Sequence, residues 1–155
     1  GFPGMPLRIL KDDFDLTLLD SLGKRVTWLQ EVCDELQLKR VACVHARAEE
    51  FAMQHREQFD IATSRAVAQL SILSELCLPL IKVGGQFIAM KSVDTEDEID
   101  AAKSAIKTLG GHIVKVEDYT IPTSDVVHRL VIVEKVSPTP RAYPRAFAKI
   151  KKAPL

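Results

Sequence analysis

Four polar sites follow apolar stretches that predict β-strands, and they hold the residues best suited to chemistry. They are Asp20, residues 47–50 (Arg-Ala-Glu-Glu), residues 63–66 (Thr-Ser-Arg-Ala) and Lys91-Ser92. In a doubly wound α/β sheet, ligands bind outside the carboxyl ends of the strands. We therefore expect these four sites to border one ligand-binding cleft.

The chain opens on a glycine-containing turn, Gly1-Phe2-Pro3-Gly4. Glycines between a strand and a helix let the backbone approach a cofactor closely. Asp20 lies 19 residues after Gly1, and an acid about 20 residues beyond such a loop binds ribose hydroxyls. An aspartate that caps the following helix fits the same position, so the spacing leaves both interpretations open.

Three cations belong to these sites: Arg47, Arg65 and Lys91. A cation at the centre of a cleft needs a partner, so Arg65 indicates a phosphate or another anionic ligand. The alternative is that the three are unrelated surface cations. For residues 47–50 the alternative is the acidic first turn of a helix, which the helix dipole favours.

Composition restricts the partners and the compartment. The formal net charge is zero, so nucleic acid or a membrane would have to be attracted by a local patch. No apolar run approaches the roughly 20 residues of a bilayer span, and no secretory signal opens the chain. Without C-x-x-C or metal-ligand spacing, we expect buried cysteines, a reducing cytoplasmic location and no metal site. The residues concerned are Cys33, Cys43, Cys77, His45, His55, His112 and His128.

Apolar periodicity predicts an alternation of strands and helices. We expect strands at 14–20, 41–44, 61–64 and 87–91, and helices at 5–10, 22–36, 67–81 and 99–109. Ser21 is the expected N-cap of the second helix, and residues 95–98 form an expected capping box for the fourth. Gly84-Gly85 and Gly110 are the expected stop signals of the third and fourth helices.

Two further strands, 113–119 and 130–135, follow one another without a helix between them. The alternation predicts an α/β, doubly wound, mostly parallel sheet, and the final pair predicts an antiparallel strand at its edge. We expect residues 1–137 to form this domain. Residues 138–155 form a basic tail that contains proline, interpreted either as a solvated extension or as a nucleic-acid contact.

Several segments together resemble one family, the bacterial 16S ribosomal RNA guanine-N7 methyltransferases, also called glucose-inhibited division protein B. The resemblance runs essentially from residue 1 to residue 155, and LLDSLGKR together with SRA is specific to it. The matching segments are GFPGMPL (1–7), LLDSLGKRVTWL (18–29), RAEEF (47–51), FDIATSRAVAQL (59–70), LCLPLIKVGGQF (76–87) and TPRAYPR (139–145).

The resemblance implies a Rossmann-like class I fold that binds S-adenosylmethionine and acts on 16S ribosomal RNA or the small ribosomal subunit. Asp20 falls on the family's ribose-binding acid, Ala48 and Glu49 flank the adenine, and Arg47 and Lys91 become basic cleft residues near the RNA. Arg65 contacts the cofactor or the target. The cofactor-binding residues implied in this way are Gly1, Phe2, Asp20, Ala48, Glu49 and Arg65.

The sequence also departs from the family pattern. The family loop reads approximately D-x-G-x-G-x-G-F-P-G-x-P-L, so this chain starts at the last glycine before Phe2, and we expect the first strand and the N-terminal helices to be absent. Ser92 replaces the usual glycine, and Ala148-Lys149-Ile150 replaces a G-x-P in the tail. Arg129 stands one place away from the arginine of the family's E-R-H-L, which in a strand turns it to the opposite face.

Guanine N7 is an exposed acceptor without a proton at neutral pH, so its methylation needs no general base. The expected task is to place N7, methyl and sulfur in line and exclude water, with Arg47, Arg65 and Lys91 holding the RNA. A small-molecule methyltransferase of the same fold is an alternative, as is an inactive fragment. A nicotinamide-dependent dehydrogenase shares the glycine loop and Asp20 but does not usually end its sheet in the strand pair.

Overall fold

The computed structural model describes residues 1–65 and 68–155. The chain divides into two compact units, Gly1–Phe51 and Ala52–Leu155, which we call the N-terminal and C-terminal units. The boundary lies within helix α3 (Ala48–Gln54). Residues 138–155, expected as a separate tail, belong to the C-terminal unit.

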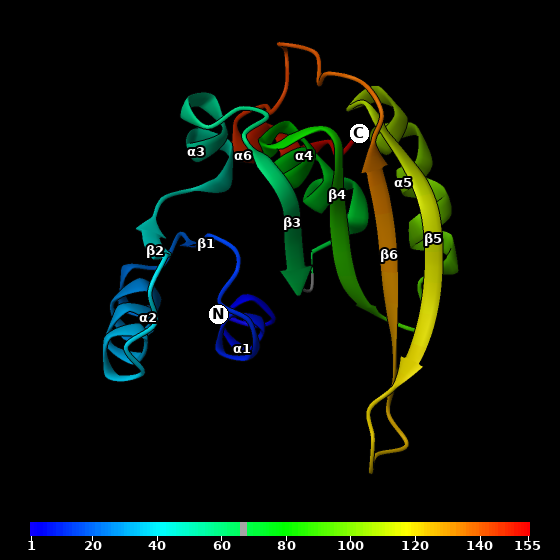
Figure 1. Cartoon of the computed structure of the whole chain (residues 1–155). Coiled ribbons are helices and arrows are strands. Elements are labelled where there is room, and N and C mark those ends of the chain that lie inside the picture. Colours follow the sequence, from blue (N-terminus) through cyan, green and yellow to red (C-terminus); the bar gives the residue numbers. More distant parts are fainter. Residues whose placement is uncertain (66–67) are drawn as a thin grey trace. The chain divides into compact units, whose positions relative to one another are not determined.

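The N-terminal unit pairs two parallel strands and packs a helix onto them. It contains α1 (Gly4–Leu10), β1 (Leu16–Asp20), α2 (Gly23–Glu35) and β2 (Val41–His45), as Figure 1 shows. The strands pair from Leu16 with Val41 to Asp20 with His45. The three- and four-residue spacing of apolar side chains in α2 buries one helix face. The core of this unit consists of Met5, Leu18, Leu29 and Cys33.

The start of α2 differs from the expectation. Leu22, not Ser21, is the N-cap residue, and its side chain cannot accept a hydrogen bond. Asp20 takes over this task, because its Oδ1 accepts the Leu22 N–H at 2.9 Å. An aspartate two residues earlier satisfies one of the amides that the helix start leaves without a partner.

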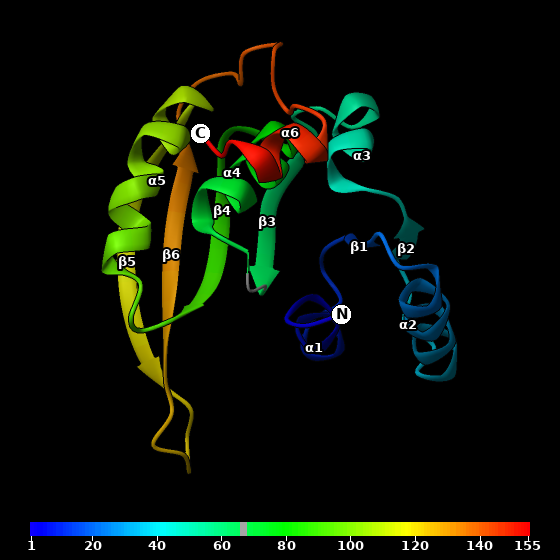
Figure 2. The same ribbon diagram turned by 180° about the vertical axis from the view of Figure 1, so that it is seen from behind.

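The C-terminal unit holds a four-stranded sheet with helices on one face. Its strands are β3 (Phe59–Arg65), β4 (Ile81–Ser92), β5 (Gly111–Thr120) and β6 (Val127–Lys135). The helices α4 (Leu70–Cys77), α5 (Glu96–Thr108) and α6 (Phe147–Lys152) lie on the same face of this sheet in both views (Figures 1 and 2). The alternation of strands and helices therefore gives the expected α/β architecture.

The strand order β3-β4-β6-β5 places the antiparallel strand differently from the expectation. β4 is parallel to β3, and β6 is antiparallel to both β4 and β5. The antiparallel strand thus lies inside the sheet and β5 forms its edge. The crossover through α5 leaves one strand position free between β4 and β5, and the short hairpin connection returns β6 into that position.

The predicted helix over 67–81 ends earlier than expected. Val67 lies outside the described residues, α4 ends at Cys77, and a 3-10 turn (Leu78–Leu80) leads into β4. Pro79 explains this end because proline lacks the amide hydrogen that an α-helix needs. Gly84-Gly85 lies within β4, where the pairing jumps from Phe59–Ile81 to Ile61–Gln86. A side chain at Gly85 would collide with the Asp60 carbonyl oxygen, so this irregularity requires glycine.

Helix α5 has its N-cap at Thr95 and its stop at Gly110, as the sequence predicts, but it spans Glu96–Thr108 and the capping box does not form. Thr95 is the N-cap residue, yet its hydroxyl donates to the Ser92 carbonyl oxygen at 3.0 Å instead of capping the helix. The acid of the expected box, Glu98, is engaged elsewhere by Lys91. At the other end Gly110 has φ +86°, a left-handed conformation typical of a helix stop.

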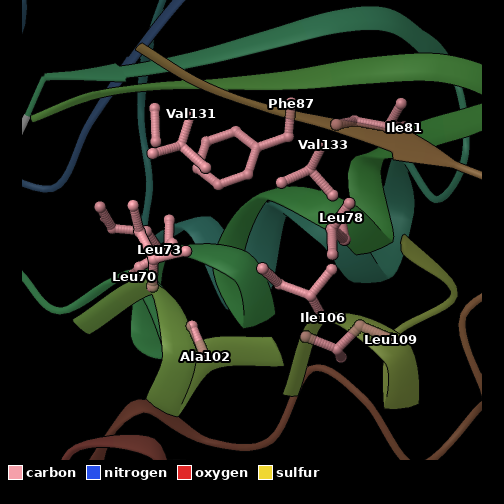
Figure 3. Packing of buried hydrophobic residues seen from close by; sticks show 12 residues of the cluster. Leu70, Leu73, Leu78, Ile81, Phe87, Ala102, Ile106, Leu109, Val131 and Val133 are labelled. Atoms are coloured by element: carbon pink, nitrogen blue, oxygen red, sulfur yellow. The ribbon is translucent and has the colours of Figure 1, made fainter. Parts of the chain in front are cut away.

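The main core lies between the sheet and the helices α4 and α5. Figure 3 shows Phe87, Val131 and Val133 pointing from the sheet toward helical side chains such as Leu70 and Ile106. We call this side of the sheet the helical face, and because side chains alternate along a strand, the neighbours of these residues lie on the opposite side, the second face. The second face includes Ile88, Met90, Ser92, His128, Leu130 and Ile132, which pair in register.

Candidate functional site

Asp20 lies at the carboxyl end of β1, as expected for a residue that meets a ligand. Its Oδ1 accepts the Leu22 N–H, and its Oδ2 accepts Arg25 Nη1 at 3.1 Å. The carboxylate therefore organises the start of α2, which is the capping interpretation. An ionised carboxylate has about four acceptor sites, so it keeps capacity for a hydroxyl ligand.

The glycine turn at residues 1–4 brings α1 close to the strand β1. The Gly1 carbonyl accepts the Met5 N–H at 2.7 Å. A Cβ on Gly4 would lie 2.9 Å from Leu16 Cδ1, so a glycine there allows close helix–strand packing. Phe2 is 52% exposed. These are the packing properties of a cofactor loop, and the ligand role of Gly1 and Phe2 stays a prediction.

Residues 47–50 form the start of α3, next to the carboxyl end of β2. Ala48 begins the helix, and Glu49 and Glu50 lie in its first turn, which confirms the acidic helix start. Arg47 Nε donates to Glu49 Oε1 at 2.6 Å, and the Glu49 side chain is 10% exposed. This hydrogen bond raises the Arg47 pKa above its usual value. Since the Ala46 N–H donates to the Asp20 carbonyl oxygen, the turn before α3 adjoins the end of β1.

Arg65 is the last residue of β3 and its side chain is exposed. It pairs in register with Met90, on the second face of the sheet. Ala66 of the same motif lies outside the described residues. Arg65 belongs to the C-terminal unit, whereas Asp20, Arg47, Ala48 and Glu49 belong to the N-terminal unit. Their convergence on one cleft therefore stays a prediction.

Lys91 does not have the environment expected of a basic cleft residue. Its side chain is 7% exposed, and its Nζ lies 2.6 Å from Glu98 Oε1 in α5. The same Nζ donates to the Ala68 carbonyl oxygen at 2.9 Å, and Glu98 also accepts the Leu70 N–H. The Lys91 side chain lies on the helical face, and its contacts link β4 to the starts of α4 and α5. This buried ion pair gives Lys91 a structural role, and its role as an RNA contact stays a prediction.

Arg129 has a similar structural role. It lies on the helical face, where Nε and Nη2 donate to Asp118 and Nη1 donates to Glu96 Oε1 at 2.6 Å. The bonds from Arg129 hold the pKa values of Asp118 and Glu96 below their usual range. The one-place displacement from the family pattern thus gives an arginine that joins the hairpin to α5.

The second face carries a feature that the sequence analysis missed. Ser92, His128 and Tyr119 form one row across β4, β6 and β5 at the carboxyl end of β4. The rings of Tyr119 and His128 stack with centroids 5.7 Å apart and planes 30° apart. Arg65 ends the neighbouring strand on the same face. The row depends on the hairpin register, which no local motif reveals.

The remaining candidates add no further chemistry. Cys33, Cys43 and Cys77 are free thiols, and burial raises the pKa of Cys43 to about 11 and that of Cys77 to about 12. Over residues 1–65 and 68–155, no group of three His, Cys, Asp or Glu side chains is arranged to hold a metal ion. No helix in these same ranges has the length and apolar character needed to span a membrane.

Structural comparison supports the same fold. The chain is similar to the structure of M. jannaschii TYW2 in complex with AdoMet, with TM-score 0.68 and 14% identity over 88% of this chain and 65% of that one. It is also similar to a protein studied for the conversion of a disulfide bond into a thioacetal group during echinomycin biosynthesis. That match has TM-score 0.70 and 14% identity over 88% of this chain and 72% of that one. At these identities the likeness shows the fold alone.

Sequence comparison identifies the family. The chain is 52% identical to the ribosomal RNA small subunit methyltransferase G of Clostridium botulinum (strain ATCC 19397 / Type A), over 100% of this chain and 66% of that protein. The chain thus spans just under two thirds of the length of this relative. Residues 1–127 match the family GidB, described as rRNA small subunit methyltransferase G. The chain therefore belongs to the rRNA small subunit methyltransferase G family.

Proposed function

We propose that this chain carries its family's methyl transfer, from S-adenosylmethionine to N7 of a guanine in 16S ribosomal RNA. The observation that carries the proposal is the family match over residues 1–127, which includes Asp20, Arg47, Ala48, Glu49 and Arg65. The fold agrees, since β1 ends at Asp20, β3 ends at Arg65, and Ala48 and Glu49 follow shortly after β2. The site would lie in the cytoplasm with the ribosomal subunits.

The N-terminal unit offers a fit for the nucleoside part of the cofactor. Asp20 presents a carboxylate that is partly exposed and has unused acceptor sites, which suits a ribose diol. The ion pair with Arg47 fixes the Glu49 side chain in the first turn of α3, so Ala48 and Glu49 offer an ordered edge for the adenine. When bound, S-adenosylmethionine supplies a methyl group activated by its sulfonium sulfur.

The C-terminal unit supplies groups for the RNA. Arg65 offers a cation for a phosphate or for the acceptor edge of guanine, the commonest partner of arginine in base recognition. The stacked rings of Tyr119 and His128 offer an aromatic surface on the same face, and bases outside a helix stack on such side chains. Because N7 carries no proton, these residues need only hold the base in place, and no acid–base pair is required.

Replacing Arg65 with alanine tests the proposal. With full-length enzyme and 16S RNA, we expect methyl transfer to fall roughly 10- to 100-fold, the range for losing a charge-assisted hydrogen bond. Lys82→Ala is the matched control, because Lys82 lies at the other end of β4 and pairs with Asp60. The product is mapped by borohydride and aniline cleavage, which breaks RNA at N7-methylguanine. Unchanged turnover by R65A would refute the role of Arg65, and methylation at another atom would refute the proposed reaction.

Calorimetric titration with S-adenosylhomocysteine tests the cofactor site separately. We compare this chain with the same chain extended by the N-terminal segment of the C. botulinum relative, because this chain spans 66% of that protein. The family loop to which residues 1–7 are similar includes glycines before Phe2, so we expect tighter binding by the extended chain. Equal tight binding would refute a contribution of that segment to the cofactor site. A small-molecule methyltransferase would bind the cofactor equally well but would show no salt-dependent affinity for RNA.

A further inference from the structure

The C-terminal segment 138–155 is anchored to its unit by buried polar contacts. Thr139 donates its hydroxyl to the Leu109 carbonyl oxygen at 2.7 Å and its N–H to Glu57 Oε1 at 2.8 Å. The Arg56 guanidinium donates to three carbonyl oxygens of the segment, those of Thr139, Pro140 and Tyr143. Apart from the bond to Leu109, these contacts join residues more than 80 positions apart in the sequence, so the start of the segment is fixed in place.

The second half of the segment is fixed as well. Arg145 makes a bidentate pair with Glu75 of α4, whose side chain is fully buried, with Nη2 to Oε2 at 2.6 Å. Ile150 in α6 is fully buried. The segment is therefore part of the folded unit and not the solvated extension that the sequence left open.

This fixed segment presents unbalanced positive charge. It contains five cations and no acid, and Glu75 balances only Arg145. The other four side chains are exposed, and none of them forms an ion pair with a carboxylate anywhere in residues 1–65 and 68–155. They are Arg141, Lys149, Lys151 and Lys152. Like charges held together on one short segment repel each other, and a polyanion removes that cost.

We propose that the segment 138–155 is a phosphate-binding surface for RNA, with Lys149, Lys151 and Lys152 as its main contacts. The proposal rests on the proposed function and extends it to a second contact region. Figures 1 and 2 show α6 near the end of the sheet where β3 and β4 begin, whereas Arg65 and Ser92 lie at the opposite end. The surface therefore contributes to RNA affinity and not to the chemical step.

A membrane is a poorer partner for this helix. An amphipathic helix at a lipid surface must insert an apolar face, and α6 uses its buried Ile150 within the protein. RNA requires only exposed cations, which neutralise phosphates and release their bound counterions.

The test compares the triple variant K149Q/K151Q/K152Q with the control K103Q/K107Q/K115Q. The control removes three exposed lysines from α5 and β5 of the same unit. Filter binding of full-length protein to 16S RNA transcript is measured over a series of salt concentrations. We expect the slope of log K against log salt to fall by about 2 to 3 in the tail variant, at about 0.7–0.9 per lost phosphate contact, and to stay unchanged in the control.

Methyl transfer to the same RNA separates this inference from the proposed function. We expect the tail variant to raise KM for RNA and to keep kcat, since its lysines lie away from the carboxyl ends of the strands. Equal slopes for the tail variant and the control would overturn the phosphate-binding surface even if the enzyme methylates RNA. A selective loss of binding to phosphatidylserine vesicles, with RNA binding intact, would overturn it in favour of a membrane. Salt-dependent binding through the tail without methyl transfer would refute only the proposed function.

Discussion

The two faces of the sheet in the C-terminal unit use charged side chains in different ways. On the helical face Lys91, Arg129 and Lys135 each bind a carboxylate from another element. On the second face their immediate neighbours in sequence are Ser92, His128 and Glu134. A step of one residue along a strand thus separates a side chain that holds the fold together from one that faces away from the helices.

The largest effect is expected at Lys135, whose side chain is fully buried. Its Nζ donates to the carbonyl oxygens of Leu78 and Ile81, at 2.7 and 3.0 Å, and to Glu57. K135M removes a buried donor from the two carbonyl oxygens and the ion-pair partner from Glu57, so we expect the free energy of unfolding to fall by about 3–5 kcal/mol. Urea unfolding measures this loss. The neighbouring E134Q on the second face is the control and should change stability by less than about 0.5 kcal/mol.

Lys91, on the neighbouring strand β4, tests the same contrast between the two faces of the sheet. K91M leaves Glu98 without its ion-pair partner, but the Glu98 side chain is 25% exposed, so water recovers part of the loss. We expect a decrease of about 2–3 kcal/mol in the free energy of unfolding. The control S92A should fall within about 0.5 kcal/mol of the parent. A stable K91M with impaired RNA binding would instead support the predicted role of Lys91 as a basic cleft residue.

These neighbours also show what the sequence could predict. Periodicity located β1 to β6 and the helices α1, α2, α4 and α5, but not α3 or α6, because alternation and three- and four-residue spacing are local properties that need a sufficiently long segment. It could not show that Lys91 faces α5. Which side chains of a strand point to the core depends on the elements that pack against the sheet. Nor could it predict the fixed C-terminal segment, since Arg145 and Thr139 find their partners 70 and 82 residues earlier in the chain. The capping role of Asp20 could be predicted because it depends only on the end of β1 and the start of the next helix.

Arg129 provides a test in the pH dependence of stability. Arg129 lowers the pKa values of Asp118 and Glu96 below their ordinary values of 3.8 and 4.5. Lowered carboxyl pKa values stabilise the folded state above pH 4.5, and this contribution disappears as the pH falls through the folded-state values. We expect R129Q to be less stable than the parent at pH 7, with the difference shrinking below about pH 4. A difference that is constant from pH 7 to pH 2 would show that Arg129 acts through packing alone.

The smallest effect on stability is expected at the stacked rings of the second face. A cross-strand aromatic pair contributes about 0.2–1 kcal/mol, so Y119A should lower the free energy of unfolding by no more than about 1 kcal/mol. If the ring also stacks on an RNA base, its loss costs about 1–3 kcal/mol of binding, which predicts a KM for RNA raised at least fivefold. Y119F keeps the ring and should restore the parent KM.

This pair of variants decides whether the second face meets RNA. Loss of stability without a change in KM would show that the stack of Tyr119 and His128 stabilises the fold and does not bind RNA. A raised KM in Y119A that Y119F restores would assign the ring a binding role, because the two variants differ only in the aromatic surface they present. The contrast between the faces would then hold at the level of neighbouring residues, since Asp118 beside Tyr119 forms an ion pair with Arg129 on the helical face.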